Sequence, residues 1–461
     1  MATIQTIIDT TSRKPEDIIN DLKEKVINPP AWSSLVKEYD PRNHPVMSKS
    51  KYPDIANPDG TIDYVTRITY DLQRLAVKRM TELCYGIPVK RNYNAQTPRQ
   101  QEAATIIENI LQRNRIDSLN IERGNYLFAS CEVMTLWYAT KEENTLYGVK
   151  SPIKLRCRNF SPMNSEKLYH LFDESSDYIA MSIAYSIKKA GKTINYFDTY
   201  TQQQHIKWEN AGQGWTEVEN EDISIGKNPT LYAWRPAPIW ENTSDLVYEM
   251  EWAMLRNGNY LRKNSKPAFA IFADEDIPFG GEKNQNSEFR TVLQFPKGSD
   301  AKYITWEGAI DNLKFFIAEL RQMFFTQLQL PDWSYESIKS SPMSGEALKQ
   351  MFIDAQLKVK DEAGRLIEFH DREINVIRAF AKIIAPQLKS EIDALQIETE
   401  ITPFAISDEK DLINNLTTAT AGKPIVSQLE AIQYLGWSRD AKKTLEQLAE
   451  EATFNSFNLT V

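Results

Sequence analysis

The sequence predicts an α+β protein, because two kinds of apolar periodicity occupy different parts of the chain. Between about Glu132 and Trp234, alternating segments are rich in β-branched and aromatic residues, which is typical of antiparallel strands. Elsewhere, apolar residues recur every three to four positions, which is typical of amphipathic helices. The longest such segment runs from Ser344 to about Ala385. A helix of ~40 residues would be about 60 Å long, so it should either bend or cross a large assembly.

The N-terminal half should form helices and then a run of hairpins. Four helices are expected before the strands, at Pro15 to Val26, Asp63 to Tyr85, Arg99 to Gln112 and Arg115 to Ala129. Gly86 and Pro88 end the second of these helices, as a glycine followed by a proline should. Turns at Ala190 to Lys192 and at Asn210 to Gly214 are expected to join neighbouring strands.

The second half should contain helices around one short β module. Ser244 is the expected N-cap of a helix that runs to about Asn264, with Asp245 in its first turn, where the helix dipole favours an acid. Short β-like segments follow, and Pro331 then ends a helix that begins near Ala309. After the long periodic segment we expect a polar strand and two helices, at Gln396 to Ile401, Asp408 to Thr420 and Ser438 to Glu451.

Composition excludes several classes of protein. The chain has 461 residues, with 54 Lys and Arg against 63 Asp and Glu and a net charge of −9. This acid surplus argues against a dedicated reader of duplex DNA, which carries a basic face, but not against a protein that lets DNA pass. No apolar run is long enough to span a bilayer, and the N-terminus lacks the apolar core of a signal peptide. We therefore expect a soluble protein, cytoplasmic when made, with no membrane partner.

The sequence offers little chemistry. Cys84, Cys131 and Cys157 form no CxxC pair and are interpreted as buried free thiols. No histidine has a His or Cys partner at metal-ligand spacing, and no glycine-built phosphate loop occurs. His370, within the long helix, is interpreted as a structural or solvated side chain. The triplet from Asp274 to Asp276 lacks a calcium or two-metal pattern and is interpreted as a solvated loop. We expect no catalytic residue, no metal and no cofactor.

One arrangement stands out. Two long helices flank a small β module, and a polar loop and a very long helix come directly after them. This order resembles the portal protein of tailed bacteriophages, in the branch typified by siphophages of Gram-positive hosts. The segment SPMSGEALKQMFIDAQLKVKDE resembles the family's entry into its tunnel helix, at Ser344, Gly345, Ala347 and Leu348. Three further segments are similar to the family's early turn, its following helix and strand, and its C-terminal pattern: GIPVKRN, RNRIDSLNIERGNYLFASCEVMTLWYA and PIVSQLEAIQYLGWSRDAKKTLEQLAEE.

The resemblance implies a portal fold assembled as a ring, with an α/β wing, a two-helix stem, a small β-containing clip, a long tunnel helix and a short helical crown. It implies an N-terminal segment and wing at 1–242, stem helices at 243–265 and 307–330, a clip at 266–306, a tunnel loop at 331–343, a tunnel helix at 344–386, a wing return at 387–424 and crown helices at 425–461.

The function that the resemblance implies is a DNA channel. A homododecameric ring would occupy one capsid vertex of the virion after assembly in the host cytoplasm, and the genome would be packaged and ejected through it. Implied partners are the large terminase subunit, then a head-completion or adaptor protein, together with major capsid and scaffold proteins. Contact with double-stranded DNA would be transient and non-specific. ATP hydrolysis would belong to the terminase.

Three groups of side chains are candidates for these roles. In the tunnel loop, Trp333, Tyr335 and Lys339 are expected to face DNA, and Lys339 is the only cation there. The expected docking surface of the clip comprises Asp274, Glu275, Asp276, Glu282 and Lys283. The second stem helix is apolar over more than one stripe, which implies neighbours on two sides. Its stem-packing residues are Phe315, Phe316, Phe324 and Phe325.

Two other readings compete with the portal. A non-catalytic helical adaptor or scaffold protein of another bacterial or phage assembly would be a monomer or dimer without an axial hole. An enzyme would need a cleft lined by titratable residues with perturbed pKa values, and the sequence gives no sign of one.

Overall fold

The computed structural model divides the chain into two compact units. The larger one, which we call the body, comprises Met1–Asp332 and Asp354–Phe404, and the C-terminal unit comprises Trp333–Ile353 and Ala405–Val461. The structure describes residues 4–24, 27–56, 60–173, 177–189, 191–264, 268–272, 291–295, 309–332, 352–404, 409–421, 424–436, 438 and 441–458. Among these residues, no helix is long and apolar enough to cross a membrane.

Helices and strands are mixed through the body, as the α+β prediction requires. Its α-helices are α1 (Ile4–Ile7), α2 (Pro15–Leu22), α3 (Trp32–Tyr39), α4 (Leu72–Tyr85), α5 (Pro98–Arg113), α6 (Ile116–Ser130), α7 (Ser244–Asn264), α8 (Ala309–Gln327), α11 (Ile353–Ile384) and α12 (Lys389–Ala394). Short 3₁₀ turns are η1 (Pro41–Asn43), η2 (Pro45–Met47), η3 (Pro162–Asn164) and η4 (Pro386–Leu388).

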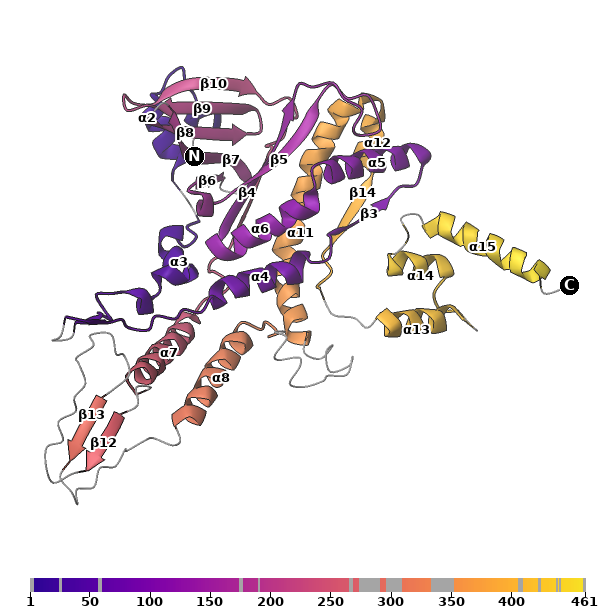
Figure 1. Ribbon diagram of the computed structural model, residues 1–461. Coiled ribbons are helices and arrows are strands. Elements are labelled where there is room, and N and C mark those ends of the chain that lie inside the picture. The colour runs from indigo at the N-terminus through magenta and orange to yellow at the C-terminus, as the bar shows by residue number, and fades with distance from the viewer. Residues whose placement is uncertain are drawn as a thin grey trace. The chain divides into compact units, whose positions relative to one another are not determined.

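The strands of the described residues form two larger antiparallel sheets and three small pairs (Figure 1). One sheet has the order β11-β4-β5, from Thr230–Trp234, Glu132–Thr140 and Lys154–Phe160. The other is a meander in the order β10-β9-β8-β7-β6, from Thr216–Asp222, Gln204–Asn210, Lys192–Thr201, Tyr178–Lys189 and Lys167–Phe172. The pairs are β1 (Ile55–Ala56) with β2 (Ile62–Asp63), β14 (Gln396–Glu400) with β3 (Lys90–Asn94), and β12 (Ala268–Phe272) with β13 (Thr291–Phe295). These confirm the predicted strand region, and the strands on either side of each predicted turn are paired, although Ala190 of the first turn lies outside the described residues.

Among the described residues, three apolar clusters stabilise the body. One of them joins α5, the β4–β5 sheet, α11 and α12 around Trp137, Ile107 and Ile377, which are fully buried. A second lies where α1 and α2 cover one face of the five-stranded sheet, at Phe197 and Trp208. The third joins the two larger sheets. The body therefore consists of two sheets in contact, each also covered by helices.

Most of the predicted helices are confirmed, and α7 has the predicted bounds. Ser244 is its first helical residue, and its hydroxyl donates to Glu38 Oε2 at 2.7 Å instead of capping the helix. The strands β12 and β13 pair in parallel, so they are not the two arms of a hairpin. In the region described, α11 is a continuous helix that passes through Gly364.

The prediction of a helix from Asp63 was wrong, because α4 begins only at Leu72. Two backbone groups of the preceding stretch hydrogen-bond to side chains of α7. The amide of Thr66 donates to Asn259 Oδ1 at 2.8 Å, and the amide of Tyr70 donates to Glu251 Oε1 at 2.8 Å. These long-range bonds hold the stretch in a non-helical course despite its helical periodicity.

In the C-terminal unit the described residues form α13 (Glu409–Thr420), α14 (Gln428–Leu435) and α15 (Ala441–Asn458). A capping box begins α14: Ser427 Oγ accepts from the amide of Glu430, while the Glu430 carboxylate accepts from the amide of Ser427. Gly436, at φ +68°, ends this helix in the left-handed conformation that glycine adopts without strain. The predicted helices near Asp408 and Ser438 are thus confirmed, with later starts.

Candidate functional site

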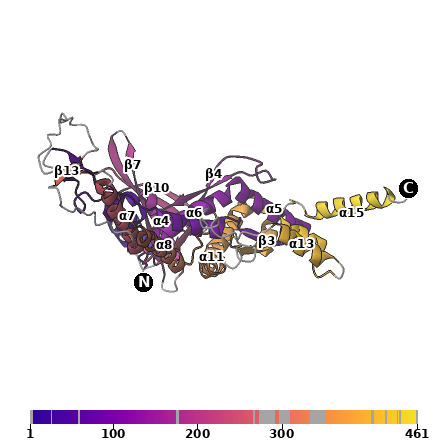
Figure 2. The ribbon, with the colours of Figure 1, turned by 60° about the horizontal axis from the view of Figure 1, so that its bottom comes forward.

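Most of the candidate residues lie outside the part of the chain that the structure describes. This holds for the tunnel-loop set (Trp333, Tyr335, Lys339), the clip set (Asp274, Glu275, Asp276, Glu282, Lys283) and the start of the tunnel helix (Ser344, Gly345, Ala347, Leu348). The phenylalanines of α8 are described. The candidate site is therefore built from α7 and α8, which lie side by side in both views, and from the contacts that fix them (Figures 1 and 2).

The four phenylalanines of α8 divide into two pairs. Phe324 and Phe325 are buried, with their rings edge to face at a centroid distance of 5.4 Å. Phe315 and Phe316, more than two helical turns earlier, are 67% and 42% exposed. The C-terminal part of α8 is thus anchored by its own chain, whereas its N-terminal part presents aromatic rings to solvent.

Large apolar side chains are exposed on both of these helices. We call this set the stem surface: Trp252, Tyr260 and Leu261 on α7, and Phe315, Phe316 and Met323 on α8. Single exposed apolar residues are ordinary, but several on two adjacent helices are typical of a surface that meets another protein.

A buried histidine–carboxylate pair fixes α7 to the N-terminal segment. His44 Nδ1 lies 2.7 Å from Glu251 Oε1, and His44 Nε2 lies 2.8 Å from the carbonyl oxygen of Glu38. A carbonyl can only accept, so Nε2 carries a proton, and a charged carboxylate favours a second proton on Nδ1. Burial lowers the pKa of His44, but these hydrogen bonds outweigh burial and raise it. The pair is therefore an ionic clamp between α7 and the chain before it.

Further contacts extend this clamp along α7. The Glu38 carboxylate accepts from Trp240 Nε1 at 2.9 Å as well as from Ser244. In the C-terminal half of α7, Gly258 lies so close to Thr66 that an added Cβ would be 2.6 Å from the Thr66 methyl group. Glycine is needed there because the two segments approach so closely. The chain from α3 to Thr66 thus contacts α7 at several points along the helix and holds it in place.

The end of α8 is fixed to α11. Lys358 Nζ donates to the carbonyl oxygen of Leu328, where the helix dipole favours a cation. Burial lowers the pKa of Lys358 to about 8. Close by, Arg235 and Glu362 form a largely buried ion pair with a nitrogen–oxygen distance of 2.7 Å.

A second ion pair fixes α11 to α6 deep in the body. The guanidinium of Arg123 donates to both oxygens of Glu373, at 2.6 and 3.0 Å, and Trp137 Nε1 donates to Glu373 at 2.9 Å. Arg123 and Glu373 are only 2% and 1% exposed. Burial raises the pKa of Glu373, but the charge of Arg123 outweighs burial and lowers it far below its usual range. Glu373 is therefore ionised and fully paired.

His370 belongs to the same network as a neutral side chain. Its Nδ1 lies 3.4 Å from Glu373, and its Nε2 lies 3.3 Å from the Tyr85 hydroxyl. Burial lowers the pKa of His370, so Nδ1–H donates to the carboxylate and Nε2 accepts from Tyr85. The prediction of a structural histidine is confirmed.

The comparison with protein families identifies this chain. The family described as "Phage portal protein, SPP1 Gp6-like" matches residues 43–455, which is nearly the whole sequence. The chain belongs to this family. No curated protein matches it. The predicted resemblance is confirmed, and the protein has the function of a phage portal: a DNA channel through the capsid, used for packaging and ejection.

In this portal protein, sequence reasoning missed the buried polar groups that fix α7, α8 and α11 in the body. One signal was available: Leu366, Phe369, Glu373 and Ile377 recur at helical spacing, so Glu373 lies on the buried face of α11. A charged residue on such a face must find a partner. No comparable signal marks His44, because its partner Glu251 is 207 positions away.

The cysteines of the portal protein are free, as predicted. Cys84 and Cys131 are buried, and Cys157 is half-buried. Burial raises the pKa of Cys131 and of Cys157 to about 12, so neither thiol is ionised at neutral pH.

Proposed function

We propose that this portal protein assembles into a homododecameric ring in which the stem surface packs against neighbouring subunits. The observation that carries this proposal is the exposure of Phe315 and Phe316 on a helix whose other end is firmly anchored. A head-to-tail contact of this kind repeats until the ring closes. Because α7 and α8 are held by buried ion pairs and aromatic packing, each subunit would present the same rigid surface to the next.

The proposed ring has the domain layout expected from the sequence. The wing comprises 1–242 and 387–424, the stem helices 243–265 and 307–330, the clip 266–306, the tunnel loop 331–343, the tunnel helix 344–386 and the crown 425–461. The tunnel loop, with Trp333, Tyr335 and Lys339, would touch double-stranded DNA transiently and without sequence preference. An acidic chain with few loop cations suits this task, because binding to phosphates scales with the cations offered.

The proposed partners follow from the same layout. The clip, with Asp274, Glu275, Asp276, Glu282 and Lys283, would bind the large terminase subunit and later a head-completion or adaptor protein. Major capsid and scaffold proteins would surround the ring at one vertex of the virion, after assembly in the host cytoplasm. We assign no catalytic step to the portal protein, since the terminase would supply the energy from ATP.

Native mass spectrometry with negative-stain imaging tests the ring. Wild-type protein should give a particle near twelve times 53.1 kDa with a central hole. The exposed surface of Phe315 and Phe316 together is about that of one fully exposed phenylalanine. Burying this surface would stabilise each interface by about 1.5–3 kcal/mol. The double variant Phe315→Ser/Phe316→Ser should therefore need a roughly 10- to 150-fold higher concentration to form rings.

The matched control is Ile121→Ser, which removes a side chain that is 46% exposed on α6, away from the stem. It should leave the ring unchanged. A defined wild-type dimer without a hole would contradict the ring, and equal losses in both variants would contradict the role of the stem surface.

A further inference from the structure

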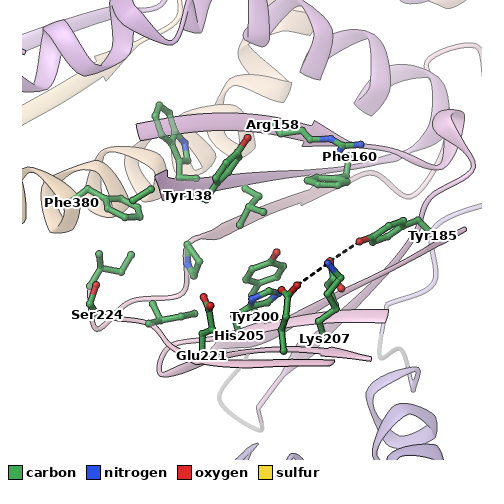
Figure 3. Close-up of a pocket in the computed structure, with 18 of the residues that line it drawn as sticks. Tyr138, Arg158, Phe160, Tyr185, Tyr200, His205, Lys207, Glu221, Ser224 and Phe380 are labelled. Carbon is green, nitrogen blue, oxygen red and sulfur yellow. Dashed lines mark hydrogen bonds and ion pairs between the residues drawn. The ribbon is translucent and has the colours of Figure 1, made fainter. Parts of the chain in front are cut away.

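A cavity of about 1040 Å³ lies in the body between the two larger sheets (Figure 3). In Figure 3, Tyr138, Arg158 and Phe160 enter it from the β4–β5 sheet, while Tyr185, Tyr200, His205, Lys207 and Glu221 enter it from the five-stranded sheet. None of the residues of the stem surface lines this cavity.

The strand register explains why these side chains converge. Asp198 on β8 pairs with Lys207 on β9, and Lys207 pairs with Glu219 on β10. Two residues along, Tyr200 pairs with His205, and His205 pairs with Glu221. Paired residues lie on the same face of a sheet, as do residues two apart on one strand. The pairing thus places two rows of polar and aromatic side chains on the face that lines the cavity.

The cavity has aromatic walls and an excess of acid. Among the residues lining it are five carboxylates, Glu166, Asp198, Glu219, Glu221 and Asp222, against three cations, Lys141, Arg158 and Lys207. Two of the cations are already paired, Arg158 with Glu166 at 3.1 Å and Lys207 with Glu219 at 3.5 Å. Aromatic rings with nearby carboxylates are the usual surroundings of a bound cationic group.

One buried carboxylate of the cavity is incompletely bonded. Asp198 is only 7% exposed, and the Tyr185 hydroxyl donates to its Oδ2 at 3.1 Å. Its other oxygen, Oδ1, has no hydrogen-bond partner among the described residues. Buried polar atoms in native proteins are nearly always paired, so an unpaired oxygen here indicates a site that a donor could fill.

The rim of the cavity is an acidic edge strand. All seven residues of β10 are exposed, and they include Glu217, Glu219, Glu221 and Asp222 but no lysine or arginine. In the strand order β10 is the last member of its sheet, so its outer side pairs with no other described strand. A free edge offers backbone donors and acceptors to an incoming extended chain.

We propose that β10 and the cavity together bind an extended, basic segment of a partner protein. The segment adds a strand to the free edge of β10, and one of its lysine or arginine side chains enters the cavity near Glu221 and Asp198. Charge complementarity selects this occupant. A second copy of β10 would place four carboxylates opposite four carboxylates, and the phosphates of DNA would be repelled by the same strand.

Binding of a defined peptide to the full-length protein tests this proposal. The probe is a fluorescein-labelled peptide in which lysine alternates with threonine and valine, and its affinity is measured by fluorescence anisotropy. A matched peptide with proline in place of valine keeps the charge but loses the valine N–H donors and the extended geometry that strand addition uses. We expect the first peptide to bind at least about tenfold more tightly than the second.

Variants of the portal protein locate the binding site. Glu219→Gln/Glu221→Gln should weaken binding of the first peptide by about tenfold or more. The control Glu398→Gln/Glu400→Gln removes the same charge from exposed positions two apart on β14 and should change affinity less than twofold. Asp198→Asn should also weaken binding. A benzophenone group on the central lysine should crosslink to residues that line the cavity.

Three results would overturn the proposal. Equal weakening by the β10 and β14 variants would mean that only net charge attracts the peptide. Equal affinity of the proline peptide would exclude strand addition. Absence of binding at millimolar peptide would mean that the acidic edge serves only to keep subunits from pairing through their sheets.

Discussion

Replacing Glu373 by glutamine should be strongly destabilising, although the two side chains have almost the same shape. In the wild type, Glu373 neutralises Arg123, and both residues are at least 98% buried. Glu373→Gln leaves the guanidinium buried and charged without a counter-ion, because the pKa of arginine is too high for the group to lose its proton. Breaking one partner of a buried pair typically costs about 3–5 kcal/mol.

Hydrogen exchange of the α11 amides measures this effect directly, even though the chain has two units and need not unfold in one step. A loss of about 3–5 kcal/mol corresponds to a fall in protection of roughly 150- to 5,000-fold. The control is Glu368→Gln on the same helix, which breaks a pair with Arg372 in which the side chains are 61% and 44% exposed. Such a pair contributes about 0.3–0.5 kcal/mol, so protection should fall by little more than twofold.

A second variant separates the unpaired charge from other effects of the substitution. Adding Arg123→Met to Glu373→Gln removes the buried charge, while the glutamine can still accept from Trp137. Part of the lost protection should therefore return. The reasoning is refuted if Glu373→Gln behaves like Glu368→Gln, or if the double variant is less stable than the single one.

Three more predictions follow from the same structure. Because the folded-state pKa of His44 is raised, its clamp is fully present below the unfolded value of about 6.5 and is lost as pH rises through the folded value. The groups that favour the charged form of His44 are Glu251, the Glu38 carbonyl and Asp71. The rate of proteolysis of the segment before α4, measured relative to a standard substrate of the same protease, should therefore rise with pH. This pH dependence should vanish in His44→Gln. Gly258→Ala should lower the free energy of unfolding by about 1–3 kcal/mol, because the added Cβ would collide with Thr66. At Gly364 an added Cβ meets nothing within 4 Å, so Gly364→Ala should raise the free energy of unfolding by up to about 1 kcal/mol. Thermal melts of both variants measure the difference. Equal changes of melting temperature in the two glycine variants would contradict the close approach of Gly258 to Thr66. Cys131, with its pKa raised to about 12 by burial, should react with iodoacetamide far more slowly at pH 8 in the folded protein than in urea, and equal rates would count against its burial.

The sequence predicted those elements whose signals are local. The extent of α7 was predicted closely, because a strong apolar period and a polar start coincide at Ser244, although Ser244 is the first helical residue and not the N-cap. The start of α4 was wrong by nine residues, because the bonds that replace helix formation come from Asn259 and Glu251, 193 and 181 positions away. No window of sequence contains that information.

In the candidate site, too, the features that the sequence did not predict depend on contacts between distant parts of the chain. The division of the α8 phenylalanines into a buried and an exposed pair depends on what α8 packs against, which its own periodicity does not specify. The cavity depends on the register of β8, β9 and β10, which brings Asp198 and Glu219 to either side of Lys207. In sequence these are three unremarkable charged residues in separate strands.

The two buried ion pairs of α11 together fix its register against the rest of the body. Glu362 and Glu373 are eleven positions apart, which is three turns of helix, so both lie on one face. Each meets an arginine held elsewhere in the body, Arg235 after β11 and Arg123 on α6. A rotation of α11, or a slide by one turn, would leave both pairs unsatisfied at once, at a cost of several kcal/mol. The segment of α11 between Glu362 and Glu373 is thus held firmly in the body, and Lys358, one turn before Glu362, also fixes the end of α8 to this helix.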